Sequence, residues 1–264
     1  AADAGVGHPS GFAAVEELLT ARALDAVVLA HPVQRHVTDA LNVSAHGVPV
    51  LVEKPPAPDV TEAARLRAAT GPVWVGFNRR FVPGIQAIRQ PTDPPVECSI
   101  DLTIHYRRRS WAPVSVDDDA LLDLGTHLVD LARWLTGAEV VAVRRAELAP
   151  AAARLEVALE RGVATIAART DRTHREAIEL TGPGGRNLGR YDIGGALGNV
   201  VARLPVGASR NPLVDSLADQ LAAFAIAIRT GYHPALGTVD DGIAAMAVVD
   251  AARRSANVAR PVAV

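Results

Sequence analysis

The sequence predicts an α/β protein in two parts: a parallel-sheet domain, then an α+β domain with a large, mainly antiparallel sheet. Two observations support this. Up to residue 77, short, continuously apolar strands alternate with helices, which is typical of a parallel sheet covered on both faces. After Asn78, strands at hairpin spacing favour antiparallel pairing. We therefore predict domains at residues 1–77 and 78–264.

The front domain contains three apolar runs that predict strands, with helical patterns before and between them. The expected strands are residues 25–30, 48–52 and 73–77, and the expected helices are residues 12–22, 36–46 and 61–69. Gly47 follows the second helix and is a helix-ending signal, while Asp59 or Thr61 can cap the third. The order of elements thus matches a parallel sheet connected by helices.

The back domain begins with a strand of alternating polarity at residues 97–107 and a helix at residues 119–135. Further expected strands are residues 140–148, 154–160, 163–169 and 176–181, and two helices at residues 212–229 and 239–255 close the chain. The glycine-rich stretch 182–189 (GPGGRNLG) contains a proline and opens no helix, so we expect a turn between two strands and not a phosphate-binding loop.

Composition excludes several classes of protein. The net charge is −2 with acids and bases interspersed, which argues against nucleic-acid binding, and no apolar run approaches the length of a membrane span. Cys98 is the only cysteine, so an internal disulfide is impossible. His31 and His36 lie five residues apart across a proline with no third ligand nearby, so we expect no metal site. A cytoplasmic location is the default expectation.

Lys54 is the single lysine among 27 basic residues. It lies just beyond a buried parallel strand, at the sheet edge where ligands bind in open α/β folds. Pro55 and Pro56 stiffen the turn that follows. A functional lysine is favoured over the alternative, a surface lysine paired with Glu53.

The helix at residues 119–135 carries a second group of polar residues. Asp123 and His127 are four residues apart and share a helical face, which suits a general base oriented by a carboxylate. Gly125 costs a helix about 1 kcal/mol relative to alanine, which suggests a close approach to the backbone there. A solvated polar face opposite a leucine stripe is the alternative interpretation.

Four segments together resemble one family: residues 30–36 (AHPVQRH), 53–55 (EKP), 75–81 (VGFNRRF) and 122–130 (LDLGTHLVD). They resemble the glucose–fructose oxidoreductase and inositol dehydrogenase family (Gfo/Idh/MocA). The resemblance implies a Rossmann-type domain, NAD or NADP as cofactor, and a homo-oligomer. It also implies hydride transfer between the nicotinamide and a hydroxyl or keto carbon of a sugar, cyclitol or related polyol.

The same resemblance implies roles for individual residues. Lys54, Asp123 and His127 correspond to the catalytic residues, with His127 taking the hydroxyl proton and Lys54 stabilising the oxygen. Asp123 would contact the substrate and support the site. The residues that would line the cofactor pocket are Pro32, His36, Glu53 and Lys54, and those that would bind substrate are Asn78, Arg79, Asp123 and His127.

The sequence departs from the family in several places. The family opens with a strand and a Gly-x-Gly-x-x-Gly loop, which this sequence lacks, so we expect the strand at residues 27–29 to lie at an open edge. His31 stands where the family prefers a small polar residue. Residues 117–119 are three acids where the family usually has small glycines. These acids either cap the helix that follows or influence the choice of substrate. Residues 107–109 (RRR), near Trp111, are a solvated strand end or a phosphate-binding group.

Two other functions fit the resemblance. Relatives of this fold use bound NAD in glycoside cleavage, and others are non-enzymatic sugar- or dinucleotide-binding regulators. An inactive truncated paralogue is a variant of the second possibility. Because Lys54, Asp123 and His127 occur together, the dehydrogenase interpretation is favoured.

Overall fold

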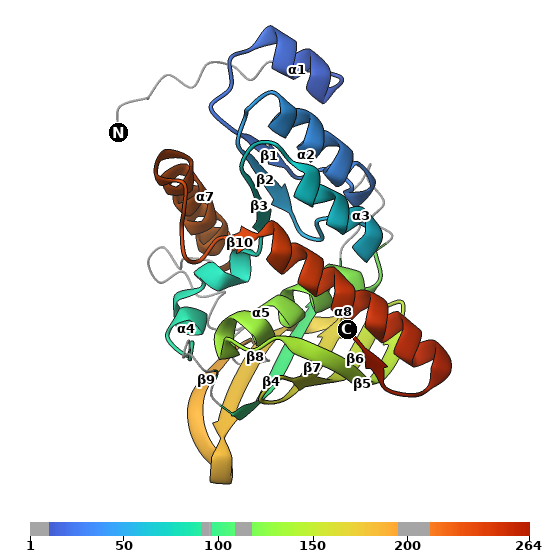
Figure 1. The fold of residues 1–264 in the computed structure, drawn as a ribbon. Coiled ribbons are helices and arrows are strands. Elements are labelled where there is room, and N and C mark those ends of the chain that lie inside the picture. The colour runs from blue at the N-terminus through green and yellow to red at the C-terminus, as the bar shows by residue number, and fades with distance from the viewer. Residues whose placement is uncertain (1–10, 91–94, 96, 109–117, 195–211) are drawn as a thin grey trace.

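The computed structural model describes residues 11–90, 95, 97–108, 118–194 and 212–264. The strands form two sheets, with orders β1-β2-β3-β10 and β11-β5-β6-β7-β4-β8-β9 (Figure 1). The first is the mainly parallel front sheet and the second is the large, mostly antiparallel sheet, so the predicted fold class is confirmed.

The front sheet contains the three predicted strands and one that the sequence did not predict. Its strands are β1 (Val27–Leu29), β2 (Val50–Glu53), β3 (Val73–Gly76) and β10 (Gly237–Thr238). The first three are parallel, and β10 pairs antiparallel with β3. In β2 all three apolar residues are 0% exposed, as continuous apolar strands predict. Among the described strands β1 lies at the edge, and its Val28 is 44% exposed.

Helices connect these strands with boundaries close to those expected. They are α1 (Val15–Ala21), η1 (Val33–Arg35), α2 (His36–Ala45), α3 (Val60–Ala64) and η2 (Arg65–Ala68). The predicted helix at residues 61–69 is thus a short α-helix continued by a 3-10 turn. Asp59 caps α3 by accepting a hydrogen bond of 2.9 Å from the backbone N–H of Glu62, and Gly47 follows α2 at φ +73°.

The large sheet has one parallel neighbour pair, β4 with β7, and is otherwise antiparallel. Its strands are β4 (Cys98–Arg107), β5 (Val140–Ala149), β6 (Ala152–Leu159), β7 (Gly162–Arg169), β8 (Asp171–Gly182), β9 (Arg186–Gly194) and β11 (Val262–Ala263). The sequence analysis placed no bounds on β9 and did not predict β11. The 3-10 turn η5 (Pro183–Gly185) joins β8 to β9, which confirms the predicted turn.

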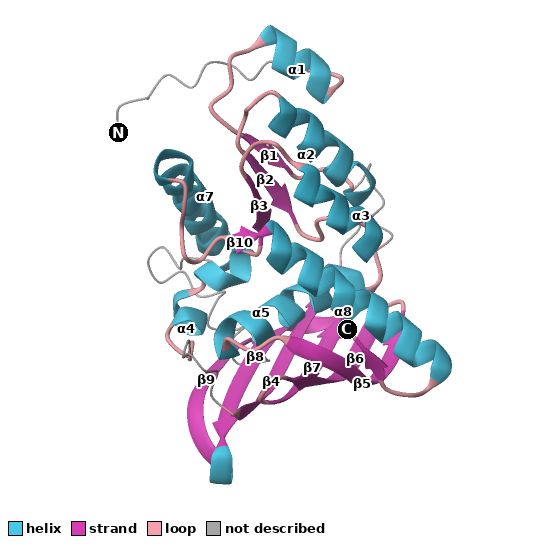
Figure 2. Ribbon diagram, in the orientation of Figure 1, coloured by secondary structure: helices cyan, strands magenta, loops and turns pink. Residues whose placement is uncertain are grey.

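The described helices of this part cover one face of the large sheet (Figure 2). They are η3 (Asn78–Phe81), α4 (Pro83–Gln86), η4 (Leu121–Gly125), α5 (Thr126–Thr136) and α8 (Val239–Val258), whereas α7 (Pro212–Thr230) lies beside the front sheet, with Phe224 against Trp74 of β3. The predicted leucine stripe is buried in this layer, at Leu121, Leu124, Leu128, Leu131 and Leu135. The predicted helix at residues 119–135 differs from expectation, because it opens with a π-helical turn, η4.

A buried ion pair fixes the helical layer to the end of β3. Arg80 on η3 donates to both carboxylate oxygens of Asp130 on α5, at 2.9 and 2.5 Å, and approaches Asp241 on α8 at 3.1 Å. Because β10 also pairs with β3, residues late in the chain complete the front sheet. The domain boundary after residue 77 therefore stays a prediction.

No helix in the described ranges is long and apolar enough to cross a membrane.

Candidate active site

Lys54 joins the front sheet to the helical layer of the large sheet. It directly follows β2, and its Nζ donates to the backbone oxygen of Asp123 at 2.8 Å and to its Oδ1 at 2.9 Å. Both side chains are mostly shielded, at 17% and 14% exposed. An ammonium group has three donors, and within the described ranges the third has no protein acceptor. Lys54 can therefore donate to a ligand without leaving Asp123.

Asp123 is held in the π-helical turn by three side chains. Its Oδ1 accepts from Lys54, and its Oδ2 accepts from the Tyr106 hydroxyl and, at 2.7 Å, from Arg108. Burial alone would raise the pKa of this carboxyl, but the Lys54 charge and these hydrogen bonds hold it well below its ordinary value. Asp123 is therefore ionised and orients Lys54.

The expected close approach at Gly125 has a local cause. A β-carbon added at Gly125 would lie 2.9 Å from Cδ1 of Leu121, a residue of the same turn. Single π-helical turns within helices often mark functional sites. Here the π turn presents both the backbone oxygen and the side chain of Asp123 to Lys54.

His127 lies at the start of α5 and is buried, with 5% exposure, so the solvated-face alternative is wrong. Burial lowers the pKa of its imidazole well below the usual value, and the positive charges of Lys54 and Arg79 lower it further. Its Nδ1 is buried and has no hydrogen-bond partner among the described residues. With its pKa so lowered, His127 is a neutral imidazole. The carboxylate of Asp123 accepts from other groups and forms no hydrogen bond with this ring.

Glu53, the last residue of β2, lies at the same sheet edge. Its Oε1 accepts from the Gln220 amide at 3.3 Å, and its Oε2 accepts from the Lys54 backbone at 3.3 Å. Burial raises the pKa of this carboxyl, while Lys54 opposes the rise. Gly76 leaves room for it, since an added β-carbon there would lie 3.0 Å from Oε1.

His36 and Pro32 occupy different positions relative to this edge. Pro32 is exposed after β1, whereas His36 is 2% exposed and connects two loops. The Nδ1 of His36 lies 2.9 Å from the Pro55 carbonyl oxygen, and its Nε2 lies 2.8 Å from the His31 carbonyl oxygen. Both ring nitrogens thus contact backbone, so His36 bridges the loop after β1 and the loop after β2.

Asn78 and Arg79 lie on η3 and are both buried. The Asn78 amide donates to the Ser216 hydroxyl of α7 at 3.1 Å. The Arg79 Nε lies 3.5 Å from Oε1 of Glu176 on β8. Arg79 is also close enough to His127 for its charge to lower the pKa of that imidazole.

The structure adds Tyr106 and Arg108, which sequence reasoning did not place in the site. The one sequence signal for Tyr106 is strand alternation, which puts it on the same face of β4 as Ile104 but does not place it beside Asp123. The solvated strand end is confirmed for Arg107, which is exposed, but is wrong for Arg108. Arg109 and Trp111 lie outside the described residues.

One of the acids before the π turn, Asp119, acts as a helix cap. Asp119 Oδ1 accepts a hydrogen bond of 2.8 Å from the Leu122 backbone N–H, which confirms the predicted capping. The Asp118 carbonyl accepts from Arg108 at 2.6 Å. Asp117 lies outside the described residues.

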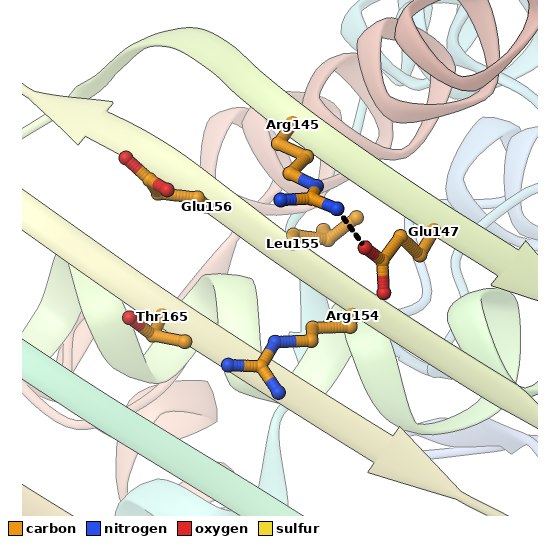
Figure 3. A pocket seen from close by; sticks show the side chains of 6 residues that line it. All are labelled: Arg145, Glu147, Arg154, Leu155, Glu156 and Thr165. Atoms are coloured by element: carbon orange, nitrogen blue, oxygen red, sulfur yellow. Dashed lines mark ion pairs between the residues drawn. The ribbon is translucent and has the colours of Figure 1, made fainter. Parts of the chain in front are cut away.

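A charged groove lies on the uncovered face of the large sheet, over β5, β6 and β7 (Figure 3). Arg145 and Glu147 form an ion pair of 2.6 Å there, beside Arg154 and Glu156. The residues around Lys54 line no part of this groove. In the described ranges no three His, Cys, Asp or Glu side chains are grouped as a metal site would require.

Comparison with known proteins gives related sequences for part of the chain. Residues 2–71 match the family described as "Oxidoreductase family, NAD-binding Rossmann fold". Inositol 2-dehydrogenase 2 of Saccharopolyspora erythraea is 33% identical over 53% of this chain and 46% of its own length. The rhizopine catabolism protein MocA of Rhizobium meliloti is 28% identical over 47% of this chain and 41% of its own length. The chain thus matches about half the length of these curated relatives.

Solved structures extend the likeness in fold to nearly the whole chain. Myo-inositol 2-dehydrogenase from Lactobacillus plantarum has a TM-score of 0.75 at 18% identity, covering 96% of this chain and 84% of its own. GenD2 from gentamicin A biosynthesis, solved in complex with NAD, has a TM-score of 0.72 at 21% identity, covering 96% and 82%. The family model thus matches residues 2–71, and the solved structures show that the fold is shared over nearly the whole chain.

Proposed function

We propose that the protein is an NAD- or NADP-dependent dehydrogenase or reductase. It transfers hydride between the nicotinamide and a hydroxyl or keto carbon of a polyol such as inositol, another cyclitol or a sugar. One observation carries the proposal. The only lysine lies at the carboxyl edge of the parallel sheet and donates to Asp123 at 2.8 and 2.9 Å, beside a buried, neutral His127.

The residues at this edge fit a nicotinamide cofactor. The Gln220 Oε1 is buried with no hydrogen-bond partner among the described residues, and Gln220 binds Glu53 next to Lys54. An unpaired buried acceptor there suits a ligand rich in amide and hydroxyl donors. Glu53, Gln220 and Pro32 would contact the cofactor. When bound, the nicotinamide supplies hydride acceptance and donation, which protein side chains lack.

The protein's own groups supply the proton chemistry. Oxidation of an alcohol releases a proton from the hydroxyl oxygen, and a neutral His127 can accept it. The third N–H of Lys54 can donate to the same oxygen and stabilise the negative charge that develops. Asp123 fixes the amine from two atoms, and Tyr106 and Arg108 fix Asp123. In this proposal Asp123 acts mainly as a positioning residue.

The test is turnover of myo-inositol with NAD or NADP, followed by NADH or NADPH absorbance. Losing a preorganised donor to a developing oxyanion typically lowers kcat by about 100- to 1,000-fold, so we expect a loss of this size in Lys54→Ala. Arg67→Ala is the matched control. It breaks an ion pair of 2.9 Å with Asp240 that is 61% and 76% exposed, and it should leave turnover unchanged. A fully active, folded Lys54→Ala protein refutes the proposal.

A homo-oligomer is part of the same proposal, because one face of the large sheet carries no described helix and is open to a second copy (Figure 2). Sedimentation of the purified protein tests this point independently of turnover.

A further inference from the structure

The covered face of the large sheet changes from apolar to polar toward the start of β8. Ile178 and Leu180 on this face are 1% and 0% exposed and pack in the core. Glu176 continues the same face toward the start of the strand at 0% exposure, and half-buried His174 precedes it by two residues. Tyr191 of the neighbouring β9 pairs with Ile178 in register and lies close to α4 (Figure 1). His174, Glu176 and Tyr191 thus form a polar surface next to the apolar core residues, and we call it the polar wall.

The groups on this polar wall are unpaired. Neither carboxylate oxygen of Glu176 has a hydrogen-bond partner among the described residues, although Arg79 Nε lies 3.5 Å from Oε1. In the same part of the chain, Arg79 Nε and Nη1, the Tyr191 hydroxyl and His174 Nε2 also lack partners. Buried polar groups in native proteins are nearly always satisfied by protein, water or ligand. A cluster of four such side chains therefore indicates a place that a polar ligand or water fills.

Arg79 links this wall to the proposed catalytic residues. Its charge lowers the pKa of His127 on one side and of His174 on the other, adding to the effect of burial in each case. Burial and the charge of Glu176 raise the pKa of the Tyr191 hydroxyl. Arg79 therefore lies 3.5 Å from Glu176 of the wall and acts electrostatically on His127.

The balance of charge selects the class of ligand. Arg79 and Glu176 face each other as a cation and an anion, so a carboxylated ligand meets repulsion from Glu176 and an amine meets repulsion from Arg79. A hydroxyl group both donates and accepts, so it can satisfy the carboxylate and the guanidinium together. A neutral molecule with several hydroxyls fits this wall best.

We propose that Glu176 is a specificity-determining residue that, with Arg79 and Tyr191, binds hydroxyl groups of a neutral polyol away from its reacting carbon. This inference rests on the proposed function for the position of the reacting carbon. It assigns substrate recognition to β8 and β9, two strands to which the sequence analysis gave no role.

The test measures binding by isothermal titration, with myo-inositol, glucuronate and glucosamine as neutral, anionic and cationic probes. The variants are Glu176→Gln and Tyr191→Phe, and the control is Glu179→Gln, an exposed acid of the same strand on its other face. Losing a hydrogen bond to a ligand hydroxyl should raise the dissociation constant for myo-inositol about tenfold in each of the first two variants. The control should bind like the parent.

Thermal unfolding separates binding from a structural role. Tyr191→Phe removes a buried hydroxyl without a partner, so its Tm should equal or exceed that of the parent even though it binds myo-inositol more weakly. A lower Tm with unchanged binding would assign Tyr191 to stability and overturn its part in the inference. This variant keeps the test informative if Glu176→Gln folds poorly.

The remaining outcomes distinguish this inference from the proposed function. Turnover in the parent with unchanged myo-inositol binding in both variants overturns the inference alone. Absent turnover, with myo-inositol binding that both variants weaken, overturns the proposed function and supports the inference. Tighter binding of glucuronate or glucosamine than of myo-inositol overturns the neutral-polyol assignment, as does binding of none of the three.

Discussion

Replacing Asp130 with alanine should destabilise the protein far more than replacing an acid in an exposed ion pair. Asp130 and Arg80 are 1% and 4% exposed and are joined by two hydrogen bonds of 2.5 and 2.9 Å. Removing one partner of a buried ion pair costs about 3–5 kcal/mol, because the other charge stays buried without compensation. Asp241, 3.1 Å from Arg80 and 21% exposed, remains, so we expect a loss near the lower end, about 3 kcal/mol.

Urea unfolding followed by circular dichroism measures the free energy of unfolding. The control is Asp240→Ala, which breaks the exposed pair with Arg67 and should cost less than about 1 kcal/mol. The slope of the free energy against urea should stay the same in both variants, so that a change in midpoint reports stability. Equal losses in the two variants would refute the reasoning from burial.

This prediction also bears on the site. Arg80 directly follows Arg79 on η3, and Asp130 lies on α5, the helix that carries His127. The Arg80–Asp130 pair therefore holds two proposed functional elements together, and a functional defect in Asp130→Ala should accompany loss of stability rather than occur without it.

Three further predictions follow from other contacts. Burial keeps the pKa of His127 well below its ordinary value, so the unfolded chain binds a proton below about pH 6.5 that the native protein excludes. The parent should therefore lose up to about 1.4 kcal/mol per pH unit from this group as pH falls, and urea unfolding should show a shallower pH slope in His127→Gln. Gly84→Ala places a β-carbon 2.7 Å from Cδ2 of Tyr191, so we expect it to lower the free energy of unfolding by about 1–3 kcal/mol, measured by thermal unfolding. The displaced Tyr191 should also weaken myo-inositol binding, and unchanged binding would contradict the role of Tyr191. Asp119→Ala removes the acceptor for the Leu122 N–H and should cost about 1 kcal/mol in urea unfolding, and an unchanged midpoint would show that the cap is dispensable.

Much of the front domain could be predicted from the sequence, because its strands are buried on both faces and therefore continuously apolar. Lys54 could be singled out for a related reason, since the end of such a strand lies at the ligand-binding edge. The bounds of β2 and the contact with Asp123 agree with that reasoning. The roles assigned to Lys54, Asp123 and His127 stay predictions.

The other partners of Asp123 could not be predicted, because they depend on how strands are ordered in the sheet. Alternation shows which face of β4 carries Tyr106, but not that β4 lies between β7 and β8. The same limit hid Glu176, which faces Arg79 only because β8 pairs with β4. Strand order is set by contacts distant in sequence, which a local pattern does not encode.

Asp123 and His127, four residues apart, form no hydrogen bond with each other, for a different reason. The prediction from their spacing assumed an α-helical period, in which residues four apart share a face. The π-helical turn at Leu121–Gly125 changes that period, so Asp123 bonds to Lys54, Tyr106 and Arg108 and not to the imidazole. Single π turns have no clear sequence signature, although Gly125 marks this one.

Ion pairs in this protein differ in how completely they use their hydrogen-bonding groups. Arg80 and Asp130 form a buried pair in which both carboxylate oxygens accept, as a structural role requires. Lys54 keeps one donor unused after binding Asp123, and Arg79 and Glu176 lie 3.5 Å apart with no hydrogen bond between them. Buried donors and acceptors without a hydrogen-bond partner lower the stability of a protein. The unpaired groups of Lys54, Arg79 and Glu176 are therefore the strongest physical reason to propose that a ligand binds near His127.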